Sequence, residues 1–146
     1  MTSLLFDTCF LIDLEREKRK GPGSAHAFLS QHGAARAAIS WTVAGEFAEG
    51  FGDIRDPACM AMLSRFEVVE TDEATAGEYA KITRYLRKQS LLIGANDLWI
   101  AASALAAGLP LVTNNASHFG RIPGLQVVGY DLSPRQPPCR APISRS

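Results

Sequence analysis

Three acidic side chains stand at positions where the surrounding residues are typical of a protein core. Asp7 follows a short apolar run, Glu46 stands among Val, Ala, Gly and Phe residues, and Asp97 opens a stretch rich in Leu, Trp, Ile and Ala. A carboxylate that faces a core destabilises the fold unless a partner satisfies it. Three converging carboxylates repel one another and raise one another's pKa values unless a cation lies between them. The set therefore predicts a divalent-metal site built from hard oxygen ligands.

Each acid also has a purely structural interpretation. Asp97 falls in the first turn of an expected helix, where the helix dipole alone stabilises a carboxylate. Asp7 could simply begin the helix that follows it. Glu46 is harder to explain in this way, because Val43 and Phe47 leave no obvious polar face around it. Taken together, the three acids favour a metal site over three unrelated structural roles.

The elements that must position these acids alternate between short apolar runs and longer helical patterns. We expect strands at residues 4–6, 37–41, 66–69, 110–113 and 126–129. We expect helices at 8–14, 25–31, from Thr42 as N-cap onward, 57–65, 73–92, and 96–107 between an Asn96 N-cap and the stop at Gly108. Strands separated by helices predict an α/β fold with a central parallel sheet and right-handed crossovers.

This order of elements predicts that the acids meet at one edge of the sheet. Ligands of open parallel sheets bind beyond the carboxyl ends of the strands. Asp7 ends the first expected strand, and Glu46 lies one turn into the helix after the second. Asp97 opens the helix that leads into the strand at 110–113, and Asn115 directly follows that strand. Spacings of 39 and 51 residues between the acids suit a site assembled from successive βα units.

Length and composition are those of an ordinary globular domain without membrane segments or disulfides. The chain has 146 residues, and none of its apolar runs approaches the roughly 20 residues that span a bilayer. Asp7 interrupts the apolar N-terminus, so we expect no signal peptide and a cytoplasmic location. Cys9, Cys59 and Cys139 are an odd number without a C-x-x-C pair. They indicate neither a disulfide framework nor a thiolate zinc site.

The charge is balanced overall but unevenly distributed. Of 15 basic side chains, Arg135, Arg140 and Arg145 lie in residues 133–146, which contain no acid. The other 132 residues therefore hold 12 basic and 15 acidic side chains, a balance that disfavours a broad positive surface for duplex nucleic acid. We expect one domain over residues 1–132 and a disordered basic tail over 133–146, which is rich in Pro and Ser.

Five segments, in order, resemble a known family. They are L-F-D-T at 5–8, T-V-A-G-E-F at 42–47, G-A-N-D-L-W-I-A-A at 94–102, L-V-T-N-N-A-S-H-F at 111–119 and R-I-P-G-L-Q-V at 121–127. Together they resemble a PIN domain, and more closely the VapC toxins of prokaryotic type II toxin–antitoxin systems. The resemblance extends from residue 3 to about residue 131.

The resemblance implies a three-layer α/β/α sandwich and a Mg²⁺- or Mn²⁺-dependent endoribonuclease, a hydrolase that is toxic through RNA cleavage. It also implies a cognate antitoxin that neutralises the toxin, and a homodimer. The family's three acids fall on Asp7, Glu46 and Asp97, and Thr8 matches a small hydroxyl residue expected to contact substrate. Many members carry a fourth acid where this chain has Asn115 and His118, so the fourth ligand is an open question.

A mechanism follows for this donor set. A divalent ion activates a water and neutralises the charge that develops on the phosphate, and a second ion completes a two-metal arrangement. Asp7 and Asp97 are the expected principal ligands, and Glu46 holds a second ion or orients the attacking water. Asn115 is expected to anchor a water on the metal through its amide oxygen. Because water attacks in place of the ribose 2′-OH, the products carry a 5′-phosphate and a 3′-hydroxyl.

Other classes of protein agree less well with the sequence. Phosphoryl transfer through an aspartyl intermediate of the D-x-D type is disfavoured, since Cys9 occupies the second acidic position. A nucleotide-binding Rossmann module is disfavoured because no G-x-G-x-x-G follows an expected strand. A catalytically silent PIN-like module that only binds RNA or a partner is the alternative that stays open. The intact set of acids speaks against it, and a metal-binding titration separates the two.

Overall fold

The protein is built on a five-stranded parallel sheet. The computed structural model describes residues 3–130, so the tail expected at 133–146 and the domain boundary at 132 lie outside the described residues. The strand order is β3-β2-β1-β4-β5, with β1 at the centre. The strands are β1 (Ser3–Phe6), β2 (Arg36–Ser40), β3 (Glu67–Val69), β4 (Leu111–Val112) and β5 (Val127–Val128). Every neighbouring pair is parallel, which confirms the fold class predicted from the sequence.

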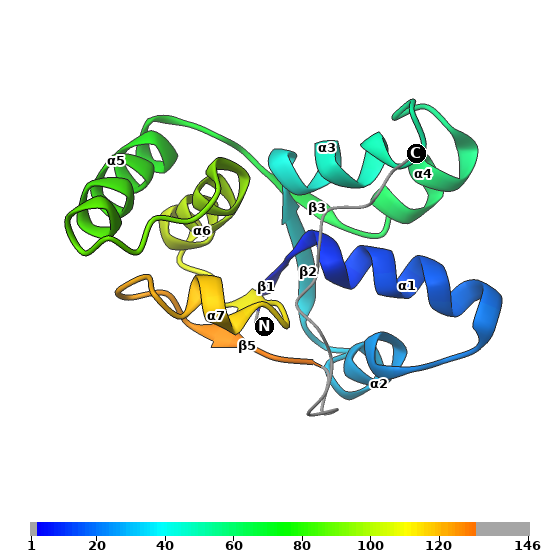
Figure 1. The fold of residues 1–146 in the computed structure, drawn as a ribbon. Coiled ribbons are helices and arrows are strands. Elements are labelled where there is room, and N and C mark those ends of the chain that lie inside the picture. Colours follow the sequence, from blue (N-terminus) through cyan, green and yellow to red (C-terminus); the bar gives the residue numbers. More distant parts are fainter. Residues whose placement is uncertain (1–2, 131–146) are drawn as a thin grey trace.

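Helices cover the sheet on both sides. In Figure 1, α5 and α6 pair on one side of the strands, and α1 and α2 lie on the other. The rings of Tyr79 and Trp99 stack at 4.0 Å between their centroids and join α5 to α6. The helices are α1 (Thr8–Lys20), α2 (Ser24–Gln31), α3 (Trp41–Glu49), α4 (Pro57–Leu63), α5 (Glu73–Lys88), α6 (Ala95–Ala107) and α7 (Ala116–Phe119). The arrangement is the three-layer α/β/α sandwich that the resemblance implies.

The core lies between the sheet and α1, α2 and α6. The Phe6 ring packs against Phe10 at 4.5 Å and against Phe28 at 5.9 Å, which joins β1 to α1 and α2. Ile100 on α6 and Leu111 on β4 are fully buried on the other side of β1. Since packed aromatic and aliphatic side chains supply most of the favourable free energy of folding, these contacts fix β1 firmly between the two helical layers. The residue that directly follows β1, Asp7, is therefore fixed in position as well.

Two helix starts differ from the expected ones. Thr42 is not the N-cap of α3, because β2 ends at Ser40 and the Ser40 hydroxyl accepts a hydrogen bond from the Val43 amide at 3.2 Å. Asn96 is not the N-cap of α6, because Gly94 occupies that position and Asn96 already lies within the helix. The prediction for the end of α6 is confirmed, with Gly108 in the left-handed conformation at φ 68°.

Two further elements exceed what the pattern predicted. α1 continues to Lys20 through the charged run after Leu14, and Lys18, Arg19 and Lys20 lie in its last turn, where the helix dipole favours cations. The short helix α7 was not expected, because four residues carry no readable period. No helix of the described residues is both long enough and apolar enough to cross a membrane.

The segment after β5 is fixed to α1 by a buried polar contact. The Tyr130 hydroxyl donates to Asp13 Oδ2, and Arg16 Nη1 donates to Asp13 Oδ1 at 2.8 Å. The Tyr130 ring also packs edge-on against Phe10 at 4.8 Å. A buried carboxylate that loses such a donor keeps its desolvation cost without the compensating bond.

We therefore expect Tyr130→Phe to lower the free energy of unfolding by about 1–3 kcal/mol. Urea unfolding followed by circular dichroism measures this. Tyr85→Phe is the matched control, because Tyr85 is exposed on α5, and it should leave stability unchanged. Equal stability of the Tyr130→Phe variant and the wild type would mean that the contact with Asp13 contributes nothing.

Candidate active site

The acids predicted from the sequence lie at the carboxyl edge of the sheet. Asp7 directly follows the central strand β1, and its backbone amide donates to the carbonyl of Val112 on β4 at 3.0 Å. Glu46 lies on α3, which follows β2, and Asp97 lies in the first turn of α6. Thr113 directly follows β4 beside Asp7. Asp7 at the N-cap of α1, Glu46 on α3 and Asp97 on α6 therefore all lie toward this edge.

Asp7 is a buried carboxylate with neutral hydrogen-bond donors. Its Oδ1 accepts from the Thr8 amide at 2.7 Å, and its Oδ2 accepts from the Thr113 hydroxyl at 2.7 Å. Burial, together with the charges of Asp97 and Glu46, raises the pKa of Asp7 to about 7, against the opposing hydrogen bonds from Thr113 and Thr8. Asp7 also caps α1, so the structural interpretation of this residue is true but incomplete.

Glu46 is held by two side chains from other elements. Its Oε1 accepts from the Thr8 hydroxyl at 2.5 Å, and its Oε2 accepts from Asn96 Nδ2 at 2.9 Å. Asn96 thus orients Glu46 from α6 instead of capping that helix. Thr8 is buried and its hydroxyl is engaged with Glu46, an arrangement suited to positioning the acid. Its predicted contact with substrate stays a prediction.

The His118 side chain lies between Asp97 and Asn115. The Nδ1 atom of His118 lies 2.9 Å from Asp97 Oδ2 and 3.2 Å from Asn115 Nδ2. The Asn115 backbone amide donates to the Thr113 hydroxyl at 3.0 Å, and Ser117 donates to Asn115 Oδ1 at 3.2 Å. Asn115 is therefore buried within a hydrogen-bond network at the same edge.

The chemistry of this donor set fits a hard divalent cation. Within residues 3–130, no lysine or arginine forms an ion pair with Asp7, Glu46 or Asp97. Across the same residues, no three His, Cys, Asp or Glu side chains are arranged so as to hold a metal ion in their present conformations. Glu46 and Asp97 instead turn to neighbouring hydrogen-bond partners. Their charges nevertheless reach Asp7 and raise its pKa, which is the repulsion that a cation among oxygen ligands removes.

Comparison with known proteins identifies the family. The PIN domain family model matches residues 4–125. The chain belongs to the PIN-domain family. Ribonuclease VapC1 of Methanocaldococcus jannaschii is 32% identical over 131 residues, covering 89% of this chain and 88% of the relative. Ribonuclease VapC of Rickettsia bellii is 32% identical over 137 residues, covering 88% of this chain and 97% of the relative.

Solved structures agree with this assignment. This PIN domain superposes on a chain of VapBC2 from Rickettsia felis, bound to a DNA fragment from their promoter, with a TM-score of 0.72 and 28% identity. That match covers 89% of this chain and 100% of the other. VapBC-1 from nontypeable Haemophilus influenzae gives a TM-score of 0.73 and 28% identity, covering 88% and 98%. The resemblance to VapC toxins predicted from the sequence is confirmed.

Sequence reasoning gave Thr113 and Asn96 no role in the candidate site of this PIN domain. Thr113 follows β4 just as Asp7 follows β1, so its position at a strand end was a readable signal. Asn96 was assigned to the cap of α6, because a lone Asn before an apolar helical run is typical of a cap. Its hydrogen bond to Glu46 depends on the approach of α3 to α6, which no local pattern encodes.

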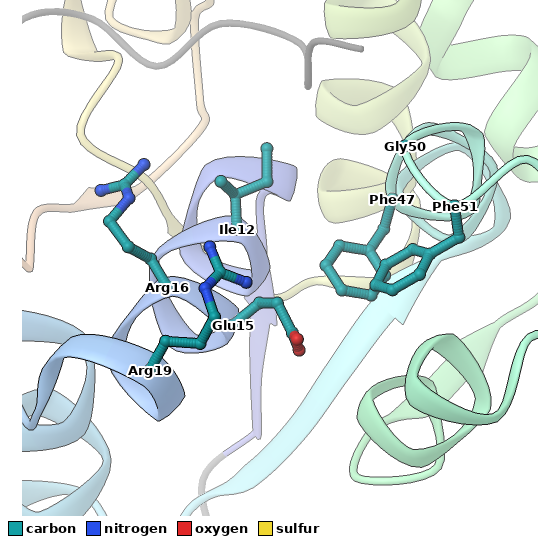
Figure 2. A pocket seen from close by; sticks show the side chains of 7 residues that line it. All are labelled: Ile12, Glu15, Arg16, Arg19, Phe47, Gly50 and Phe51. Atoms are coloured by element: carbon teal, nitrogen blue, oxygen red, sulfur yellow. The ribbon is translucent and has the colours of Figure 1, made fainter. Parts of the chain in front are cut away.

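A groove lies between α1 and α3, next to the acids but not lined by them. It holds about 270 Å³ and is lined by Ile12, Glu15, Arg16, Arg19, Phe47, Gly50 and Phe51. Figure 2 shows the phenyl ring of Phe47 on α3 beside that of Phe51, just after this helix, with the Glu15 carboxylate pointing toward them from α1. The ring centroids are 5.2 Å apart. Phe47, which lines the groove, directly follows Glu46, so the groove is adjacent to the acidic site.

The raised pKa of Asp7 makes the stability of this PIN domain depend on pH. Because the pKa is about 7 in the folded state and near 3.8 in the unfolded chain, the contribution of Asp7 to stability is fully present below about pH 4. It is lost as the pH rises through about 7, at a cost on the order of 4 kcal/mol by pH 8. We expect Asp7→Asn, which retains a capping side chain, to be more stable than the wild type at pH 8 and similar to it at pH 4. Thermal unfolding without divalent metal measures both.

Asp13→Asn is the control for this comparison, since Asp13 is also buried but pairs with Arg16. It should be less stable than the wild type at pH 8. If Asp7→Asn is likewise destabilised at pH 8, the Asp7 carboxylate is not under electrostatic strain in the folded protein.

Proposed function

We propose that this chain is the ribonuclease toxin of a toxin–antitoxin pair and that it hydrolyses RNA phosphodiesters with a divalent metal ion. The observation that carries the chemistry is Asp7, a buried acid whose pKa is raised by burial and by the charges of two further acids. The relatives named ribonuclease VapC support the activity. The acids fit the requirement of phosphodiester hydrolysis for a cation close to the reacting phosphate.

Asp7, Asp97 and Glu46 are the residues that would hold the ion. Carboxylate oxygens favour Mg²⁺ or Mn²⁺ over softer metals. Bound there, the ion supplies an acidified water and charge neutralisation at the phosphate. This agrees with the absence of an arginine or lysine paired with these acids among residues 3–130.

The surrounding side chains orient these acids. Thr8 and Thr113 fix the two oxygens of Asp7, and Thr8 and Asn96 fix the two oxygens of Glu46. Glu46 is only half-buried, so water can reach it, and we assign to it the role of accepting the proton of the attacking water. Asn115 supports the water or the phosphate from the β4 side. Attack by water leaves a 5′-phosphate and a 3′-hydroxyl.

We expect Asp97→Asn and Glu46→Gln each to lower the kcat/KM for RNA cleavage by at least about 100-fold, because each removes a charged ligand or proton acceptor. A fluorogenic RNA assay with Mg²⁺ or Mn²⁺ measures the loss. Glu49→Gln is the matched control, since Glu49 is an exposed acid on the same helix as Glu46. It should stay within about twofold of the wild type.

Retention of cleavage in either of the first two variants would remove that acid from the site. A wild-type protein that binds RNA but does not cleave it with either metal would instead support the catalytically silent binding module.

The antitoxin is proposed to cover both the acids and the adjacent groove. The similar solved structures include VapBC assemblies and a toxin–antitoxin complex from Klebsiella pneumoniae, which is 27% identical with a TM-score of 0.64. A basic side chain of the partner would satisfy the acids where a cation otherwise lies. The groove is lined by Ile12, about one turn after Asp7, and by Phe47, directly after Glu46. A partner segment that reaches the acids along α1 and α3 would therefore also pack on these apolar side chains. The homodimer expected from the resemblance stays a prediction.

We expect the product of the neighbouring reading frame to inhibit cleavage by the wild type. Ile12→Glu, which places a charge in the groove, should need at least about tenfold more antitoxin for half-inhibition, with unchanged cleavage in its absence. Met60→Glu is the control, because Met60 is exposed on α4 outside the groove. Titration of antitoxin into the cleavage assay measures all three.

Equal inhibition of Ile12→Glu and the wild type would exclude the groove from the contact. Cleavage by the wild type that no amount of antitoxin reduces would contradict the toxin assignment, even with the nuclease intact.

A further inference from the structure

One segment at the end of β4 contacts two of the three acids. Thr113 donates to Asp7 Oδ2 at 2.7 Å, and five residues later His118 Nδ1 lies 2.9 Å from Asp97 Oδ2. Between them, Asn115 donates from its backbone to Thr113 and lies 3.2 Å from His118 through its side chain. Because Nδ1 must donate to the Asp97 carboxylate, the Asn115 amide nitrogen is only its neighbour, and the segment contacts the two acids separately, through Thr113 and through His118.

The geometry points to His118 as a positioning residue of this ribonuclease, one that fixes the Asp97 carboxylate for the cation through its Nδ1 atom. The inference rests on the proposed function, because it assigns Asp97 to the ion. The His118 imidazole orients Asp97 without adding a further negative charge to a site that already raises the pKa of its central acid.

The fold anchors the short helix α7 that carries His118. Phe119, the next residue, is fully buried. Arg121 fixes the end of α7 by donating from Nε to the Ser117 carbonyl and from Nη1 to the Leu91 carbonyl, each at 3.0 Å. The imidazole is thus attached to a short helix whose own side chains and backbone are anchored. Rigid support of this kind is what a residue needs to set the direction of another side chain.

The contact also leaves one Asp97 oxygen for a ligand. Within residues 3–130, His118 is the side chain that hydrogen-bonds Asp97, and it does so at Oδ2. Oδ1 has no such partner there and is the oxygen that can face a cation. Outer partners that orient a metal ligand typically change metal affinity by about 10–100-fold when removed. A direct ligand role and a purely structural role for His118 are the alternatives to exclude.

The test measures Mn²⁺ binding to the RNA-free protein by calorimetry, beside melting temperature and cleavage. His118→Ala should raise the Kd for Mn²⁺ by about 10–100-fold. His118→Asn should stay within about threefold of the wild type, because an Asn amide nitrogen takes the position of Nδ1. At saturating Mn²⁺, the KM for RNA should be the same in both variants and the wild type.

His32→Ala is the matched control. His32 lies at the end of α2, hydrogen-bonds the Phe28 carbonyl at 2.9 Å and stacks on the Phe28 ring. This variant also loses an imidazole with a hydrogen bond, so its melting temperature should fall while its Kd for Mn²⁺ stays unchanged.

Two results would overturn the inference. A Kd for His118→Ala within twofold of the wild type would leave His118 with a structural role only. An equal loss of Mn²⁺ affinity in His118→Ala and His118→Asn would make the imidazole a direct ligand. Neither outcome would contradict the proposed function. That function is contradicted by a different result, an Asp97→Asn variant that cleaves RNA like the wild type.

Discussion

The structure depends on one electrostatic constraint, the presence of Asp7 as a buried acid at the end of the central strand. Its charge is opposed by burial and by two neighbouring acids, and neutral donors compensate only part of the cost. An ionised carboxylate in this position lowers the stability of the folded protein unless a cation lies nearby. The fold tolerates it because β1 and α1 are fixed on both sides by aromatic packing around Phe6 and Phe10. The stability of the core thus maintains a strained site.

The parallel sheet turns distant residues into neighbours. Because β1 lies between β2 and β4, the residues that follow these strands share one edge. Asp7 receives Thr113 from β4, and the helix after β2 brings Glu46 to Thr8. Every acid is hydrogen-bonded by a side chain from another element. The positions of the acids therefore depend on how the helices and strands of the domain pack together. This VapC-type ribonuclease keeps the three acids apart, yet close enough for the charges of Asp97 and Glu46 to raise the pKa of Asp7.

The sequence predicted the parts of this arrangement that have a local period or a strand end. The parallel sheet, the three acids at its edge and the stop of α6 at Gly108 followed from such patterns. The roles of Ser40, Asn96 and His118 did not. Ser40 caps α3 where Thr42 was an equally good candidate, and the contacts of Asn96 and His118 form only when α6 meets α3 and α7. Propensity describes one element at a time, whereas these contacts belong to pairs of elements.

The most direct test of the central claim is proton release on metal binding. Since a pKa of about 7 leaves Asp7 half protonated at pH 7, a cation that binds its carboxylate should displace about half a proton per chain. Calorimetric titration with Mg²⁺ or Mn²⁺ in buffers of different ionisation enthalpy measures this number. The account predicts about half a proton for the wild type near pH 7, almost none near pH 9, and none for Asp7→Asn at either pH. Metal binding by the wild type without proton release near pH 7 would contradict it.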